Sequence, residues 1–463
     1  MDEETRGWRA LPPALVLGLG LIAVQTIVMA VYTALFDGPY GAPPSVWISN
    51  IGVDASGSAL CAYGAAELAQ RSTGTERRGF QIASTAWLAA LVMQFVWLAA
   101  FVLLRSPWSD HDDGWITVER YSWFVVQVLP GIGLAVATER RHRGLAVVGG
   151  VIAVVSHPPP FVLRALWSLP ALEGKPIKLL AAALSLLGLV MIAVLAVKLA
   201  PVTAVPAQGR AAVALRRAAV ALRIWMVAVV VGTGPLLVGL TSHGAGAFAL
   251  YKLGLVGGAA IHAGAFGWLA FGLLGAARAG GLSRGKLVVA GAASLWCGGV
   301  MLTKLVFLYA SLYGSRGRGA QPDHETLALA VPLVALAGIA IFATEIGSFV
   351  GWYRQQPFGK DERGNDEAIG AFAGLAARHR EEQLRRDATG KVVWIILLML
   401  ASAGIQGWIF RDTDSGDHMA LLMAMGAGCS LVALSLIARL CSEAAQAFDR
   451  EPDLPAARVV GAG

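Results

Sequence analysis

The sequence predicts an all-α integral membrane protein, a polytopic helical bundle of about twelve transmembrane helices with its N- and C-termini in the cytoplasm. The 463 residues are 56% hydrophobic and only 14% charged, with a mean hydropathy of +0.62, which is too apolar for a soluble chain of this length. Runs such as 178–197 carry charge only at their ends and are long enough to cross a hydrocarbon core of roughly 30 Å. The third observation, the distribution of Lys and Arg, gives the orientation.

Apolar stretches of about 18 to 30 residues, bounded by charges or by Pro and Gly, define the predicted spans. The second stretch is rich in small and polar residues and carries Asp54 and Glu67, so it is either a helix shielded from lipid or an interfacial one. The fifth contains Pro158, Pro159 and Pro160, which cannot continue a helix and are expected at a membrane edge. The predicted spans are residues 11–35, 46–69, 82–104, 121–138, 144–163, 178–200, 219–240, 247–276, 287–313, 325–353, 391–410 and 418–440.

Positive residues accumulate on one side of these spans. Of the 37 Lys and Arg, 27 fall in loops on the side of the N-terminus and 8 on the opposite side. Cytoplasmic loops of membrane proteins carry this excess, and a missed helix would invert every later loop. The net charge of +7 therefore reports orientation, and we expect no nucleic-acid partner. The first span lacks a small-residue cleavage site and is expected to be a retained helix.

The predicted organisation has four parts. Residues 1–353 hold the first ten transmembrane helices, and 391–440 hold the last two. Residues 354–390 form a cytoplasmic loop with an amphipathic helical period, and 441–463 form a cytoplasmic tail. The loop is a candidate surface for protein partners, or a connector whose arginines meet anionic lipid in the bilayer. A composition rich in Ala, Gly and Val, with Arg favoured over Lys, is typical of GC-rich bacterial genes, so we expect the bacterial cytoplasmic (inner) membrane.

Ionisable residues inside spans are costly and are therefore the first candidates for function. They are Asp54, Lys252, His262, Lys304 and Glu345. A rise of about 1.5 Å per residue places Asp54 and Lys304 at similar depth, and more loosely His262 and Glu345. One interpretation is a proton or ion relay that couples substrate movement to a gradient. The other is a set of static pairs, with the lysines reaching outward to the interface.

Histidines and carboxylates gather in the predicted outer loops. Imidazole with carboxylate suits zinc and similar divalent ions, so these residues are candidate metal ligands. Ordinary polar loop residues, or histidines that titrate at an acidic outer pH, are the alternatives. The candidates are His111, Asp112, His324, Asp417 and His418.

Several enzyme and cofactor signatures are missing from the sequence. It contains no CxxC, no CxxCH, no pair of histidines at haem spacing and no GxxxxGK[ST] phosphate loop, so no cofactor is assigned. The leading hypothesis is a secondary transporter that moves a small solute or ion with proton or ion coupling. Gly/Pro interruptions at Pro130, Gly232–Pro235 and Pro332 are expected to break helices around its site. The alternative is a non-catalytic membrane subunit that anchors a larger complex, and a membrane-embedded enzyme comes third.

Reporter fusions test this topology. Fusions after residues 75, 142, 281 and 370 should all report the cytoplasm, because each position lies in a loop on the positive side. A single fusion that reports the opposite side would contradict the twelve-span arrangement.

Overall fold

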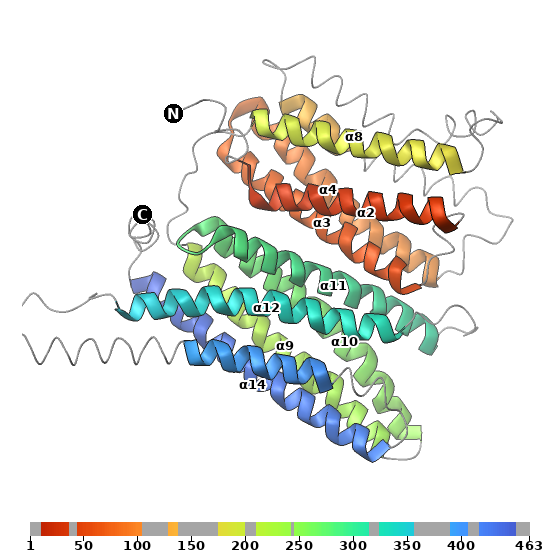
Figure 1. The fold of residues 1–463 in the computed structure, drawn as a ribbon, viewed down its shortest axis with the longest axis vertical. Helices are drawn as coiled ribbons and strands as arrows, with labels where there is room; N and C mark the ends of the chain where they lie inside the picture. The colour runs from red at the N-terminus through yellow and green to blue at the C-terminus, as the bar shows by residue number, and fades with distance from the viewer. Residues whose placement is uncertain are drawn as a thin grey trace, which may run out of the picture. The chain divides into compact units, whose positions relative to one another are not determined.

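The computed structural model is helical wherever it describes the chain, apart from short turns (Figure 1). Its helices are α2 (Pro13–Phe36), α3 (Pro44–Arg71), α4 (Gly74–Leu103), α8 (Lys175–Leu199), α9 (Arg210–Thr241), α10 (Ala245–Ala279), α11 (Arg284–Tyr313), α12 (His324–Gln355) and α14 (Gly416–Arg450), with shorter helical stretches at Val128–Ala137 and Thr389–Ile405. The described residues are 11–36, 44–103, 128–137, 175–199, 210–241, 245–313, 324–355, 389–405 and 416–450. The all-α prediction is confirmed for these residues.

Seven of the described helices are long and apolar enough to cross a membrane, which indicates a multi-pass membrane protein. Helices lie at eleven of the twelve predicted positions, and the remaining position, 144–163, falls outside the described residues. The total of twelve spans and the location of the termini stay predictions. The seven spans are Pro13–Val31, Gly74–Val96, Ala211–Val238, Ala249–Ala279, Arg284–Val306, Ala330–Tyr353 and Met419–Asp449.

Several helices are longer than the apolar runs that predict them. The run 219–240 belongs to α9, which begins at Arg210, and the run 418–440 belongs to α14, which continues to Arg450. Hydropathy marks only the part of a helix that lies in hydrocarbon, whereas alanine and arginine continue the helix beyond it at little cost. The first ten residues of the segment predicted as a tail, 441–463, are therefore helical.

The expected helix breaks at Gly and Pro do not occur. α9 runs without interruption through Gly232 and Pro235, and α12 runs through Pro332. Pro130 likewise lies within the helix Val128–Ala137. Proline is tolerated inside membrane helices because neighbouring groups and small backbone adjustments satisfy the freed carbonyl. This part of the sequence-based prediction was wrong.

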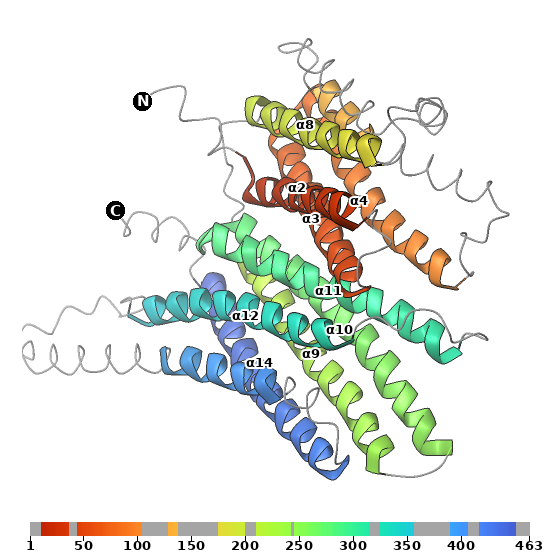
Figure 2. The ribbon, with the colours of Figure 1, turned by 45° about the vertical axis from the view of Figure 1, so that its right-hand side comes forward.

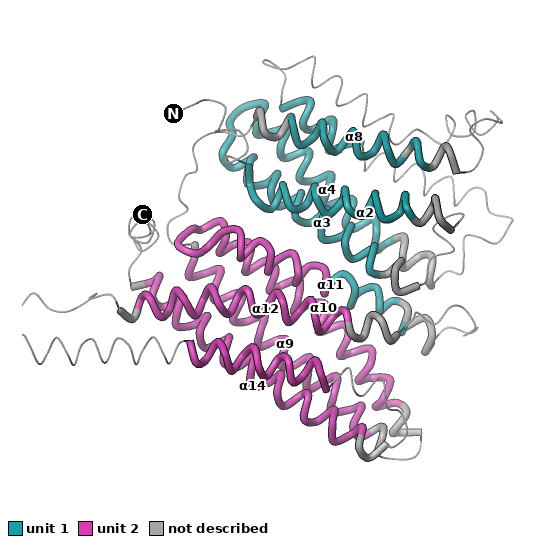
Figure 3. Tube along the Cα trace, viewed as in Figure 1, with its two compact units in different colours: residues 1–205, 298–327 teal, residues 206–297, 328–463 magenta. Residues whose placement is uncertain are grey.

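The helices form two compact units (Figure 3). Unit 1 comprises residues 1–205 and 298–327, and unit 2 comprises 206–297 and 328–463. In unit 1, α3 packs against α2 and α4, and α8 packs against α2 (Figure 2). Its interior contains the buried side chains of Leu11, Leu15, Leu19, Cys61, Ala62, Ala65, Leu68, Ala69, Phe80, Ala83, Trp87 and Leu134.

In unit 2, α9 packs along α10 and also against α14. Small residues bring the first two backbones together, since a Cβ atom at Gly258 would lie 2.7 Å from the Gly232 Cα. A Cβ at Gly272 would likewise lie 2.8 Å from the Ala218 nitrogen. Lipid tails are as apolar as leucine, so burial of apolar side chains between helices in a bilayer gains little free energy. Van der Waals contact between closely packed backbones therefore stabilises such helix pairs.

Substitution of Gly258 by alanine should destabilise unit 2 by about 1–3 kcal/mol, because the added methyl group meets backbone that cannot easily move. Gly264→Ala is the matched control on the same helix, since nothing lies within 4 Å of its Cβ position. We expect this control to be neutral or to gain up to about 1 kcal/mol of helix propensity. Thermal unfolding of the detergent-solubilised variants measures both effects, and equal unfolding temperatures would contradict the assigned contact.

Candidate functional site

Asp54 is the acidic centre of unit 1. It lies in the first half of α3, where its half-buried carboxylate accepts a hydrogen bond from the Nε2 group of Gln94 on α4. Gln94 is itself buried, with 8% of its surface exposed. A second bond, from the Ser84 hydroxyl to the Ala62 carbonyl at 2.8 Å, also joins these two helices. The pair is thus held between two helices that pack along each other.

This pair has more acceptors than donors. The Oε1 atom of Gln94 is buried and has no hydrogen-bond partner among the described residues. A carboxylate offers about four lone-pair positions, and the Asp54 carboxylate receives one bond within the described part of the chain. Unmatched buried acceptors favour a proton, a cation or a donor-bearing solute.

Lys304 lies on the part of α11 that belongs to unit 1. This part meets α3 at two glycines, because a Cβ at Gly299 would lie 3.4 Å from the Gly52 Cα. The two helices run in opposite directions (Figure 1), so Asp54 and Lys304 lie on opposite sides of that contact. Seven residues of helical rise separate them, which is roughly 10 Å. No ion pair joins the two side chains, although the sequence suggests similar depth for them.

His262 belongs to the packing between α9 and α10 in unit 2. Its Nδ1 atom lies 2.7 Å from the Gly258 carbonyl oxygen of its own helix, and its ring centroid lies 6.4 Å from that of Phe266. Phe266 in turn packs on Trp225, with centroids 4.4 Å apart. Lys252 is half-buried ten residues earlier on α10, which is roughly 15 Å along the axis. The surroundings of His262 are those of a packed aromatic cluster.

Glu345 holds the turn between α10 and α11. α10 ends at Ala279, and Gly280 and Gly281 adopt positive φ angles of 83° and 78°, a conformation that side chains rarely allow. The buried carboxylate of Glu345 then accepts a 2.7 Å hydrogen bond from the Ser283 backbone nitrogen, directly before α11 begins at Arg284. A carboxylate at this position satisfies an otherwise unpaired amide and complements the helix dipole.

Lys286 is the second partner of this carboxylate. Its Nζ atom lies 3.1 Å from a Glu345 oxygen, and its side chain is 55% exposed whereas that of Glu345 is 3% exposed. The two bonds, from a backbone amide and from an ammonium group, compensate for much of the cost of burying the charge. Glu345 therefore has a structural role that fits the static interpretation.

The five in-span candidates divide between the units. Asp54 and Lys304 belong to unit 1, whereas Lys252, His262 and Glu345 belong to unit 2. Sequence reasoning missed Gln94, the partner of Asp54. Its only signal was an isolated carboxamide within the apolar run 82–104.

The side chains of the predicted metal ligands His111, Asp112, His324, Asp417 and His418 lie outside the part of the chain whose side chains are described. Among the residues that are described, no three His, Cys, Asp or Glu residues gather closely enough to hold a metal ion. The metal site stays a prediction.

Comparison of the chain with known protein families, with curated proteins and with solved structures finds no match.

Removal of the Glu345 charge should loosen the turn at residues 280–283. Glu345→Gln is expected to cost about 1–3 kcal/mol, because it weakens a buried charged hydrogen bond. Lys286→Gln should cost less than about 1 kcal/mol, since the lysine side chain is mostly exposed. Hydrogen exchange of the 280–287 amides and thermal unfolding measure both. Equal effects of the two substitutions would show that the ion pair, and not the bond to the Ser283 amide, stabilises the turn.

Proposed function

We propose that this protein is a secondary transporter of a bacterial cytoplasmic membrane that moves a small solute or ion in exchange with, or together with, a proton or another ion. The single observation that carries this proposal is the Asp54–Gln94 pair, a carboxylate bonded to a buried carboxamide between two helices of unit 1. The twelve-span arrangement with both termini inside is part of the same proposal.

The pair can accommodate both charge states of Asp54. In the anionic state the carboxylate accepts the Nε2–H of Gln94. In the protonated state Asp54 gains an O–H donor, and a half-turn of the Gln94 carboxamide presents Oε1 as its acceptor. Two hydrogen-bonded arrangements of one pair suit a coupling site, because Asp54 then keeps a partner whether it holds a proton or has lost it.

The surrounding structure favours Asp54 over the other in-span candidates. Glu345 is bonded to a backbone amide and to Lys286 at a helix end, and His262 lies in an aromatic cluster. Lys304 is the remaining candidate in unit 1. It is separated from Asp54 by roughly 10 Å along the helix axes. We propose that Lys304 contacts an anionic group of the solute while Asp54 carries the proton or ion.

An anchoring subunit of a larger complex is the second candidate function. The structural roles of Glu345 and His262 favour it, because Glu345 joins α12 to the turn before α11 and His262 lies in the packing of α10 against Gly232 of α9. In this case the segment 354–390 would be the partner surface.

Asp54→Asn should abolish coupled transport. Full-length protein is reconstituted into liposomes that contain a pH-sensitive dye, and solutes and ions are added in panels under an imposed membrane potential. The substitution keeps the size of the side chain but removes its negative charge, so we expect the solute-dependent pH change to fall about tenfold or more. Glu76→Gln, at an exposed carboxylate of α4, is the matched control and should transport as the wild type does.

Solute-dependent flux that Asp54→Asn leaves at the wild-type rate would contradict the role of the Asp54–Gln94 pair. If the wild-type protein shows no flux and purifies with a stoichiometric protein partner, transport is contradicted and the anchoring subunit is favoured.

A further inference from the structure

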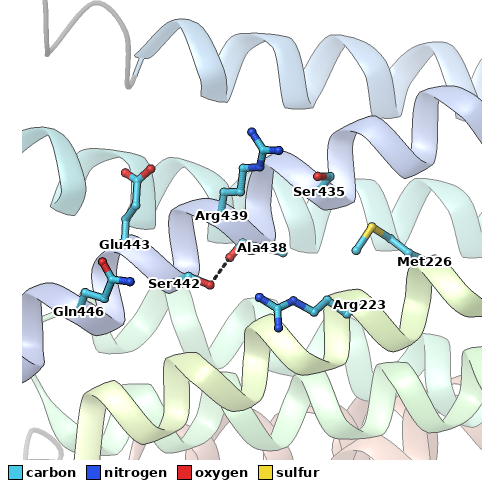
Figure 4. A pocket seen from close by; sticks show the side chains of 8 residues that line it. All are labelled: Arg223, Met226, Ser435, Ala438, Arg439, Ser442, Glu443 and Gln446. Atoms are coloured by element: carbon cyan, nitrogen blue, oxygen red, sulfur yellow. Dashed lines mark hydrogen bonds between the residues drawn. The ribbon is translucent and has the colours of Figure 1, made fainter.

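A pocket of about 370 Å³ lies between α9 and α14 in unit 2 (Figure 4). This volume is within the roughly 300–1,000 Å³ typical of small-molecule sites. Figure 4 shows Arg223 extending along α9 below Ser442, while Arg439 and Glu443 extend from the other edge of α14. The lining residues are Arg223, Met226, Ser435, Ala438, Arg439, Ser442, Glu443 and Gln446.

An ion pair between the exposed side chains of Arg216 and Asp449 shows the register of the two helices. In that register, with the helices antiparallel, Arg223 is level with Ser442 and Met226 is level with Arg439. This agrees with the residues that line the pocket. Arg223 and Arg439 thus come from different helices and are three residues apart along the axes, which is roughly 4.5 Å.

The part of α9 and α14 that carries these two arginines corresponds to the edge of the hydrocarbon core. Residues 224–241 of α9 follow Arg223 without a charge, and residues 419–438 of α14 precede Arg439 without a charge. Each uncharged run has about 20 residues and covers roughly 30 Å, the thickness of the hydrocarbon. Arg223 and Arg439 are the charged residues at the boundary ends of these runs, where lipid phosphates lie.

The charges of the pocket suit a phosphate group. Both arginine side chains are exposed, and neither forms an ion pair with another residue of the described chain. Guanidinium groups bind phosphate oxygens through paired hydrogen bonds, and the hydroxyl group of Ser435 is a further donor in the lining of the pocket. Glu443 is the opposing charge, and it reduces the net charge of the lining to one positive unit.

The helix surfaces that continue from the pocket toward the hydrocarbon are apolar and exposed. Val227 and Val230 of α9 have 53% and 55% of their surface exposed, and Val432 and Met425 of α14 have 51% and 52% exposed. Acyl chains that cover these side chains would lead directly to a headgroup in the pocket.

We propose that this pocket binds the phosphate of an anionic glycerophospholipid, with Arg223 and Arg439 on the phosphate and the acyl chains along α9 and α14. The loops rich in Lys and Arg are predicted to lie in the cytoplasm, and this end of α9 and α14 is on the same side. The site would therefore lie in the inner leaflet. The proposal is independent of transport, because it concerns the lipid contact of unit 2 and not the Asp54–Gln94 pair.

Native mass spectrometry of the full-length protein in detergent tests the site with dioleoyl phosphatidylglycerol as the probe and dioleoyl phosphatidylcholine as the neutral comparison. Arg223→Gln and Arg439→Gln should each lower the retention of phosphatidylglycerol about fivefold, as expected for one arginine near an anionic lipid. Arg78→Gln removes an exposed arginine of α4 outside the pocket and should retain the lipid as the wild type does. Glu443→Gln should raise retention, because it removes a like charge. Thermal unfolding confirms that each variant is folded.

Equal loss of lipid in Arg78→Gln and the pocket variants would overturn the proposal, since it would show diffuse attraction between lipid and protein. The proposal would also be overturned if the wild-type protein retained phosphatidylcholine as well as phosphatidylglycerol. It would likewise be overturned if folded Arg223→Gln and Arg439→Gln variants retained phosphatidylglycerol as the wild type does. Glycerol 3-phosphate is added as a soluble competitor. If it displaces the lipid at the same concentration, the pocket is a site for a soluble phosphate ester and not for a lipid.

Discussion

Close contact between helix backbones is the constraint on which the rest of this structure depends. At Gly258 and Gly272 of α10 no side chain larger than hydrogen fits without a shift of the neighbouring backbone, and Gly64 of α3 is in the same position against Leu15. In a bilayer the hydrophobic effect does not drive helices together, so van der Waals contact at small residues and interhelical hydrogen bonds must do so. Bonds such as that between Ser402 and Ser430 at 2.7 Å add to this contact.

Tight packing also determines how ionisable side chains are accommodated. Glu345 is buried because the turn before α11 supplies a backbone amide and Lys286 for its charge. Asp54 is different, since its partner Gln94 retains an acceptor atom without a bond in the described part of the chain. One carboxylate thus stabilises a helix connection, whereas the other keeps capacity for a proton, a cation or a solute. The same physical requirement, compensation of a buried charge, yields a structural role in one place and a candidate site in another.

Prediction from the sequence succeeds where the physics is local. Long apolar runs place the helices well, because the thickness of the hydrocarbon sets the length of an uncharged segment. It fails at helix ends such as Arg210 and Arg450, since polar residues can continue a helix beyond the membrane. It also fails at Pro235 and Pro332, where the surrounding structure tolerates a residue that breaks isolated helices.

The sequence by itself determined that this is a helical membrane protein and which few ionisable residues lie within its predicted spans. The side of the membrane on which each loop lies stays a prediction from the positions of Lys and Arg. Only the tertiary structure decided the partners of those residues: Gln94 for Asp54, Lys286 and Ser283 for Glu345, and no ion pair between Asp54 and Lys304. Distance along one helix is a local property, whereas the register between two helices depends on contacts such as that of Gly299 with Gly52. These contacts join residues far apart in the chain, and no local pattern encodes them.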